Sequence, residues 1–168
     1  MKSILKVVFI SVFIISCNKT VLEQEFSCSY ESFSSTTEKV IDVKKSFSVE
    51  IPTHWKTNLF YDELQSSIYS ADTTKQLTKT VLIDITQLQI GYQFDDHFKK
   101  KLNLNDSIHK LKIKNQNAFQ FKEKSAYYAI SSGKKGRFSY QILNIFVKQN
   151  DVYSFHLKTE VYGDSDIN

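Results

Sequence analysis

Along most of the chain after residue 43, apolar and polar residues alternate with a period of two, the pattern of strands that bury one face. The first such segment runs from Phe47 to Ile51 and ends at Pro52, which has no amide proton for a sheet. The longest, Lys79 to Ile90, changes phase at Thr86-Gln87, which predicts a β-bulge there. Further strands are predicted at residues 56–61, 66–71, 111–113, 119–121, 127–131, 138–147 and 153–161.

One segment in the middle of the chain has the helical period instead. Phe94, Phe98 and Leu102 are four residues apart, with acids before them and lysines around their end, which predicts an amphipathic helix of about three turns. Turns are predicted at residues 115–117, 133–136 and 149–151. The sum is an α+β domain, an antiparallel sheet of about six to eight strands with a helix packed on one face.

The first 16 residues have the pattern of a secretory signal peptide. Lys2 and Lys6 precede an apolar run from Val7 to Ile15, which is shorter than the ~20 apolar residues of a membrane span. The residues Ile14-Ile15-Ser16-Cys17 resemble the lipobox of bacterial lipoproteins, in which the cysteine becomes the new N-terminus and is lipidated. The resemblance implies a diacyl or triacyl anchor on Cys17. The alternative is an ordinary signal peptide that happens to contain a cysteine.

We therefore expect three parts in the chain. Residues 1–16 are the lipoprotein signal peptide, residues 17–42 the lipidated cysteine and a flexible tether, and residues 43–168 the folded domain. The protein is expected in the cell envelope, exported from the cytoplasm and held to a bacterial membrane by lipid on Cys17. Asn18 after the cysteine favours the outer membrane, by resemblance to the sorting rule of some bacteria.

Charge argues against a nucleic-acid partner. Removing residues 1–16 removes Lys2 and Lys6 and no acid, so 20 Lys+Arg remain against 18 Asp+Glu, a net charge of +2. Arg137 is the one arginine, whereas nucleic-acid readers depend on the planar guanidinium fork. We expect no nucleic acid among the partners.

The cysteines predict no internal disulfide. Cys17 is consumed by lipid, which leaves Cys28 alone in a polar, serine-rich stretch. Cys28 is interpreted as an unpaired thiol of the tether, with an intermolecular bridge or a reactive thiol as the alternative.

No motif in the chain predicts catalysis, a metal or a cofactor. The four histidines are His54, His97, His109 and His156. Asp95-Asp96-His97 is the densest ligand cluster, but neighbours on a helix diverge by ~100° and His109 lies twelve residues on from His97. We interpret Asp95 and Asp96 as acids at a helix start, and His156 as a solvated residue on the polar face of the last strand. There is no Gly-x-Ser-x-Gly nucleophile elbow.

Two basic features are interpreted structurally. Ser132-Gly133-Lys134-Lys135-Gly136 lacks the spacing of a P-loop and predicts a hairpin tip. The lysines 99–101, 110, 112 and 114 form a basic run that could steer the domain to anionic headgroups, with a solvated helix end as the simpler interpretation.

The start of the domain, Phe47-Ser48-Val49-Glu50-Ile51-Pro52-Thr53-His54-Trp55, resembles the first strand of PsbP-like domains. The segment from Ile145 to Phe155 is similar to the closing hairpin of that family. The resemblance implies a sandwich on a central antiparallel sheet, in modules that mostly bind or stabilise rather than catalyse. Such domains usually finish with a helix on the sheet. Here residues 163–168 contain helix N-cap residues and no helix after them, so we expect the C-terminal helix to be missing.

Three functions follow as hypotheses. The first is a membrane-anchored, non-enzymatic binding or accessory module that seats an envelope protein partner or a small ligand on a sheet face or near Trp55. The second is a hydrolase-like envelope enzyme with an unrecognised His/Asp site. The third is a purely structural envelope protein.

Overall fold

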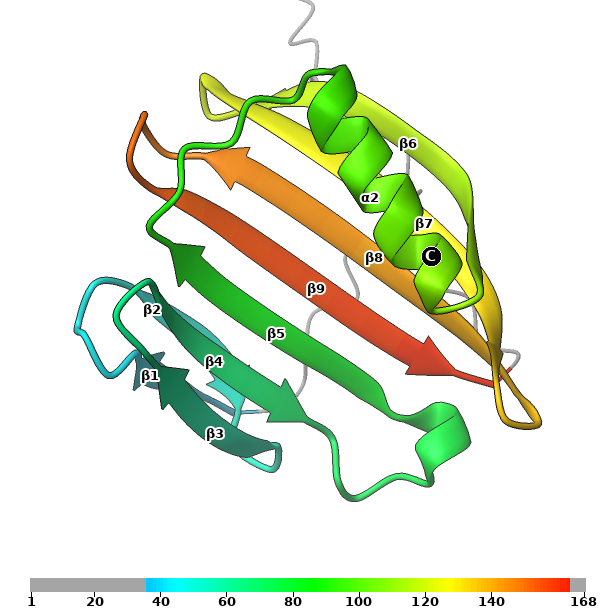
Figure 1. Ribbon diagram of the computed structural model, residues 1–168. Helices are drawn as coiled ribbons and strands as arrows, with labels where there is room; N and C mark the ends of the chain where they lie inside the picture. The colour runs from blue at the N-terminus through cyan, green and yellow to red at the C-terminus, as the bar shows by residue number, and fades with distance from the viewer. Residues whose placement is uncertain (1–35, 164–168) are drawn as a thin grey trace, which may run out of the picture.

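The domain is a seven-stranded antiparallel sheet with one long helix on one face (Figure 1). The computed structural model describes residues 36–163. The sheet order is β3-β4-β5-β9-β8-β7-β6. This confirms the expected α+β class. The elements are β3 (Lys56–Tyr61), β4 (Gln65–Ala71), η1 (Leu77–Lys79), β5 (Val81–Leu88), α2 (Asp96–Ile108), β6 (Leu111–Phe121), β7 (Lys124–Lys135), β8 (Phe138–Lys148) and β9 (Ser154–Tyr162).

A short hairpin precedes the sheet and corrects the domain boundary. β1 (Thr37–Ile41) pairs with β2 (Ser48–Pro52), so residues 37–42 belong to the fold and not to a tether that ends at residue 42. The buried carboxylate of Asp42 organises the turn between the two strands. It accepts hydrogen bonds from the amides of Ser46 (2.6 Å) and Phe47 (2.8 Å) and from the hydroxyl of Ser66 on β4 (2.7 Å). The turn is thereby fixed to the main sheet.

Helix α2 begins where the sequence predicts and ends later. The carboxylate of Asp95 caps it by accepting from the amide of Phe98 at 2.9 Å. The helix continues to Ile108, so its last turn contains no basic residue and the lysines 99–101 lie in its first half. The expected basic end of the helix is therefore wrong. Its inner face packs on an aromatic cluster made of Tyr92, Phe94, Phe98, Tyr127 and Phe146, with Leu102.

Two local irregularities differ from the expectation. β5 pairs in continuous register on both sides, so the bulge at Thr86-Gln87 is wrong, and the phase change arises because β5 carries apolar side chains on both faces. The predicted turn at residues 115–117 is the exposed edge strand β6, which has a register shift between Ile113 and Asn115. The turn itself lies at Lys122-Glu123, whose φ angles are +45° and +65°.

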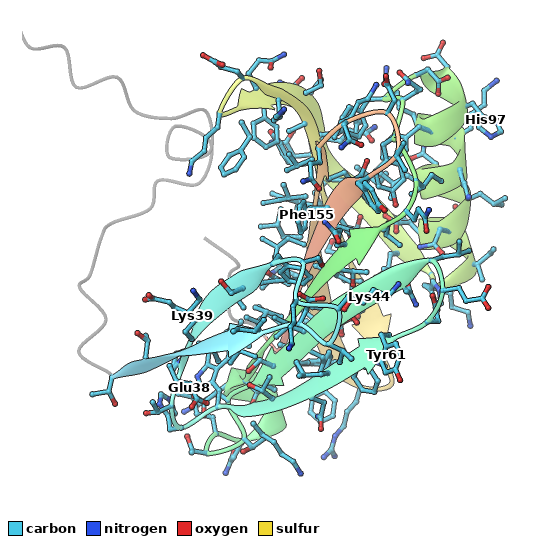
Figure 2. All side chains as sticks on the ribbon, turned by 90° about the vertical axis from the view of Figure 1, so that its left-hand side faces the viewer. Glu38, Lys39, Lys44, Tyr61, His97 and Phe155 are labelled. Atoms are coloured by element: carbon cyan, nitrogen blue, oxygen red, sulfur yellow. The ribbon has the colours of Figure 1, made fainter. Side chains whose placement is uncertain are left out.

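The two faces of the sheet are covered at opposite corners. α2 lies over β6–β8 on one face, and the hairpin β1–β2 lies on the other face behind β3 and β4 (Figure 1). Figure 2 shows Glu38 and Lys39 of the hairpin and His97 of α2 on opposite sides of the molecule. Phe47, the residue before β2, meets Phe155 of β9 edge to face, with ring centroids 5.4 Å apart. Among the elements of residues 36–163, each face therefore has one half that is covered and one half that is not.

The predicted anchor segment lies outside the described residues, as do Cys17, Cys28 and residues 164–168. Among the helices that are described, none combines the length and the apolar character needed to cross a bilayer.

Candidate functional site

The uncovered half of the α2 face carries charged and polar side chains. Alternation along β9 places His156, Lys158 and Glu160 on this face, beside Asn144 and Phe146 of β8. Asp84 of β5 pairs with Lys158 in the register and so lies on the same face. The face changes from aromatic to charged where the cover of α2 ends.

A groove of about 510 Å³ follows this boundary. Its walls are the C-terminal half of α2 on one side and β7, β8 and β9 beneath. A smaller hollow of about 220 Å³, lined by Tyr92, Phe98 and Phe146, shares Asn105, Asn144 and His156 with it. The residues that line the groove are Asn105, Asp106, His109, Leu111, Lys134, Lys135, Tyr140, Ile142, Asn144, His156, Lys158 and Glu160.

His156 is built into the floor of this groove. Its ring stacks on Phe146 with centroids 4.3 Å apart and an interplanar angle of 12°. Nε2 lies 2.9 Å from Oδ1 of Asn144, a carbonyl oxygen that only accepts, so the ring carries its proton on Nε2. Burial, helped by the charge of Lys158, lowers the pKa of His156 from 6.5 to about 4. The expectation of a solvated surface histidine is therefore wrong, because Phe146 and Asn144 enclose the ring.

Glu160 is the centre of a second network at the far end of the groove. Its carboxylate pairs with Nζ of Lys158 at 2.8 Å. Burial raises the pKa of Glu160, but the hydrogen bond and charge of Lys158 outweigh it and leave the pKa below its usual value. Burial and the hydrogen bond to Glu160 raise the pKa of Tyr140, so this hydroxyl stays protonated.

Lys135 closes the network from β7. Its ammonium donates to the hydroxyl of Tyr162 at 2.9 Å and lies 5.4 Å and 5.3 Å from the ring centroids of Tyr140 and Tyr162. The hydrogen bond to Tyr162 raises the pKa of Lys135. The sequence signal for both networks is the polar residue at every second position of β9, which we interpreted as a solvated face.

Asp106 completes the groove from the helix. It is buried on α2 and accepts a hydrogen bond from the hydroxyl of Ser131, a fully buried residue of β7. His109 follows at the helix C-cap. The groove thus brings together two histidines and two carboxylates. Asp106, Glu160 and His156 each bond to a partner other than one another, however, and Ser131 is too buried to meet a substrate.

The remaining sequence candidates do not meet. Asp95 caps α2, and Asp96 lies 3.5 Å from Lys99 on the helix surface. His97 points away from the sheet on the outer side of α2 (Figure 2). His54 lies 3.9 Å from Asp72, which Lys75 also pairs at 3.3 Å. Within residues 36–163, no three His, Cys, Asp or Glu side chains come close enough to hold a metal ion.

The run of lysines at 99–101, 110, 112 and 114 and Trp55 do not line the groove. Lys100, Lys101 and the lysines 110, 112 and 114 are exposed on α2 and near the edge strand β6. Trp55 is half-buried in the turn after β2, whereas the aromatic cluster is under α2. The aromatic cluster is therefore not at Trp55, and a binding site near Trp55 stays a prediction.

Gly133 is a packing residue and not part of a phosphate cradle. It lies within β7, where a Cβ would come within 2.7 Å of the carbonyl oxygen of Lys110 and 2.9 Å of Cδ2 of Leu111. The close approach of β6 therefore requires glycine. The tip of the β7–β8 hairpin is at Gly136, whose φ of +62° suits a turn.

Comparison with known proteins supports the fold. No family model and no curated protein matches the sequence. The solution structure of the cyanobacterial PsbP protein CyanoP from Synechocystis sp. PCC 6803 is similar, with a TM-score of 0.53 at 10% identity over 82% of this chain and 85% of that chain. A protein of unknown function from Pseudomonas aeruginosa matches with a TM-score of 0.40 at 10% identity, over 76% of this chain and 83% of that chain. The chain therefore has a PsbP-like fold.

Proposed function

We propose that this chain is a lipid-anchored, non-enzymatic binding module of the bacterial cell envelope, and that the groove beside α2 is its binding site. The observation that carries the proposal is the internal pairing of the groove's charged groups. Glu160 pairs with Lys158, and Asp106 accepts a hydrogen bond from Ser131. His156 is neutral at pH 7. Such a floor offers fixed donors, acceptors and aromatic surface for recognition.

The anchor rests on the lipobox resemblance at residues 14–17. Several acyl chains on one cysteine hold a protein to a membrane almost irreversibly, because each buried methylene contributes ~0.8 kcal/mol. Metabolic labelling with an alkyne fatty acid tests it. We expect label on the wild-type chain and none on Cys17→Ser, with Cys28→Ser as the matched control that keeps the label. Equal labelling of wild type and Cys17→Ser would contradict the anchor.

Photo-crosslinking in native membranes tests the groove. A photoreactive residue at Lys134, on the groove rim, should capture a defined envelope partner, and the same residue at Lys39 on the hairpin should not. The capture should fall when Asn105→Trp fills the groove. Capture from both positions, or capture unchanged by Asn105→Trp, would move the binding site elsewhere. No capture at native abundance would favour a purely structural envelope protein.

One observation favours a second candidate, a hydrolase-like envelope enzyme. Asp106, His109, His156 and Glu160 line one groove, which is the meeting of carboxylates and histidines that such an enzyme needs. Chromogenic ester and phosphate substrates separate the candidates. A binding module gives no turnover above background. Turnover by the wild type that is lost in His156→Gln and kept in Lys39→Ala would establish the enzyme instead.

A further inference from the structure

The two ends of the main sheet differ in their exposed apolar side chains. The strand register places the turns β3–β4, β6–β7 and β8–β9 at one end, together with the exit of β5. The turn β1–β2 joins them, because Asp42 binds Ser66 and Nζ of Lys44 donates to the carbonyl oxygen of Glu63 at 3.1 Å. We call this end the loop end. Its five loops lie along the left-hand side of Figure 1.

Every loop of the loop end carries at least one exposed large apolar residue. Tyr61 and Leu64 are each 65% exposed and Phe60 is 56% exposed around the β3–β4 turn. At the opposite end, formed by residues 53–55, 72–80, 108–110 and 136–137, Ile108 at the end of α2 is the one exposed large apolar side chain among those described, at 69%; Leu77 is not described there. The exposed apolar residues of the loop end are Val43, Phe60, Tyr61, Leu64, Ile90, Phe121, Val152 and Tyr153.

We propose that the loop end inserts its apolar tips into the surface of a lipid bilayer. The tips stand on separate loops and alternate with charges of both signs, such as Lys44, Lys122, Glu63 and Asp151. A fluid interface accommodates scattered tips of this kind, and aromatic residues such as Phe60 and Tyr61 suit the boundary between headgroups and acyl chains. Figure 2 views the molecule from this end, with Tyr61 and Lys44 on neighbouring turns.

The length of chain outside the structure allows this orientation. Eighteen residues separate Cys17 from Thr36, and an extended chain of that length spans roughly 60 Å. Thr36 lies beside Thr53 at the end of the hairpin opposite to Val43. A short connection between Cys17 and Thr36 would hold the end of the sheet opposite to the loop end at the membrane. The 18-residue connection is longer than the five-residue strands of the hairpin, so it also allows the loop end to reach the membrane. This step rests on the proposed anchor at Cys17. The apolar tips themselves do not.

Because charges of both signs are nearly balanced at the loop end, the apolar contacts should carry the binding. Binding to the bilayer should therefore persist at high salt. A basic patch would behave in the opposite way, since its attraction to anionic lipids is screened by salt.

Site-specific fluorescence tests the proposal. The full chain with Cys28→Ser and an NBD label at Tyr61→Cys is added to vesicles of phosphatidylethanolamine and phosphatidylglycerol that contain a headgroup-region nitroxide lipid. We expect a blue shift and several-fold stronger quenching than for the label at Thr73→Cys, on the opposite end. Val152→Cys is a second reporter on a separate loop, should the first disturb the turn.

The possible results distinguish a lipid bilayer, a protein partner and a second copy of the chain as the group that covers the loop end. Equal quenching at positions 61 and 73, or none at either, would overturn the insertion. A label at position 61 that stays aqueous in pure lipid but is shielded in native membranes would assign the loop end to a protein partner and also overturn it. Concentration-dependent shielding without lipid would assign it to a second copy of the chain. If the wild-type chain takes up no alkyne fatty acid at Cys17 but the label at position 61 is still quenched, the proposed anchor is contradicted and the insertion of the loop end is not.

Discussion

The two halves of the α2 face share one backbone geometry and differ in chemistry. Over β6–β8 the helix covers Tyr127, Ala129 and Phe146, and the face is aromatic and buried. Over β9 the same alternation presents His156 and Glu160, and the face is polar. The strand alternation is the same in both halves, and the difference between them is whether α2 lies on the sheet. Where a helix lies on the sheet, side chains pack against it, and where none does, they hydrogen-bond one another across strands.

The largest effect should come from the covered half. Phe146 is 5% exposed and lies under α2, so Phe146→Ala should lower the free energy of unfolding by about 3–5 kcal/mol. Leu104→Ala, on the outer surface of the same helix, should change it by less than about 0.5 kcal/mol. Urea unfolding followed by circular dichroism measures both. Equal losses would mean that α2 is not seated on the aromatic cluster.

The next effect is a dependence of stability on pH from His156. Its pKa is about 4 in the folded protein and 6.5 when unfolded, so between these values the unfolded chain binds more protons. Stability is therefore full above pH 6.5 and falls as the pH drops toward 4, by about 3 kcal/mol in total.

His156→Gln keeps a donor for Asn144 and removes the titration. Urea midpoints at pH 7 and pH 5 should therefore fall less in His156→Gln than in the wild type. Protonation of the carboxylates with lowered pKa values also destabilises the folded protein in acid. This loss occurs in both proteins, so it cancels when the wild type is compared with His156→Gln. Identical pH dependence in the two proteins would contradict a neutral, half-buried His156.

The link between α2 and β7 should have a moderate effect. Asp106→Ala leaves the fully buried hydroxyl of Ser131 without this acceptor and should cost about 1–3 kcal/mol. Asp106→Asn keeps an acceptor and should cost less. Asn103→Ala, an exposed position on α2, is the control and should be near neutral. Equal costs for Asp106→Asn and Asp106→Ala would show that charge, and not pairing, matters there, because both substitutions remove the charge and only Asn keeps an acceptor.

The smallest effect on stability should come from the ion pair on β9. Lys158→Gln removes the partner of Glu160 at a partly exposed site and should change the free energy of unfolding by at most about 1 kcal/mol. It should nevertheless raise the pKa of both Glu160 and His156, since Lys158 lowers each. NMR titration checks both values. Unchanged pKa values would show that the groove floor is not one electrostatic unit.

The sequence predicts the architecture well because strand and helix periods are strong local signals. Phe94, Phe98 and Leu102 place the helix, and the alternation along β8 and β9 is clear from the residues. Turns with weak signals are missed. Lys122-Glu123 makes a turn with positive φ but lacks the Asn or Gly that would predict it, whereas the polar residues 115–117 lie in an edge strand where polarity costs nothing.

The groove is not predictable from the sequence, because its residues come from α2, β7, β8 and β9. Polar alternation in β9 predicts a solvated face unless the packing of neighbours is known. Only the fold shows that the ring of His156 stacks on Phe146 and that Tyr140 hydrogen-bonds to Glu160. Asp106 and His109 are separated by two residues at the end of a helix, and nothing local relates them to β9.

The most direct test of this account is the pKa of His156, because one value reports whether the uncovered half of the face is an enclosed network or open surface. NMR titration of the histidine ring signals, assigned with His156→Gln, measures it in the wild type. We predict a pKa of about 4, with the proton on Nε2. A value near 6.5 would contradict the network and remove the groove as the proposed binding site.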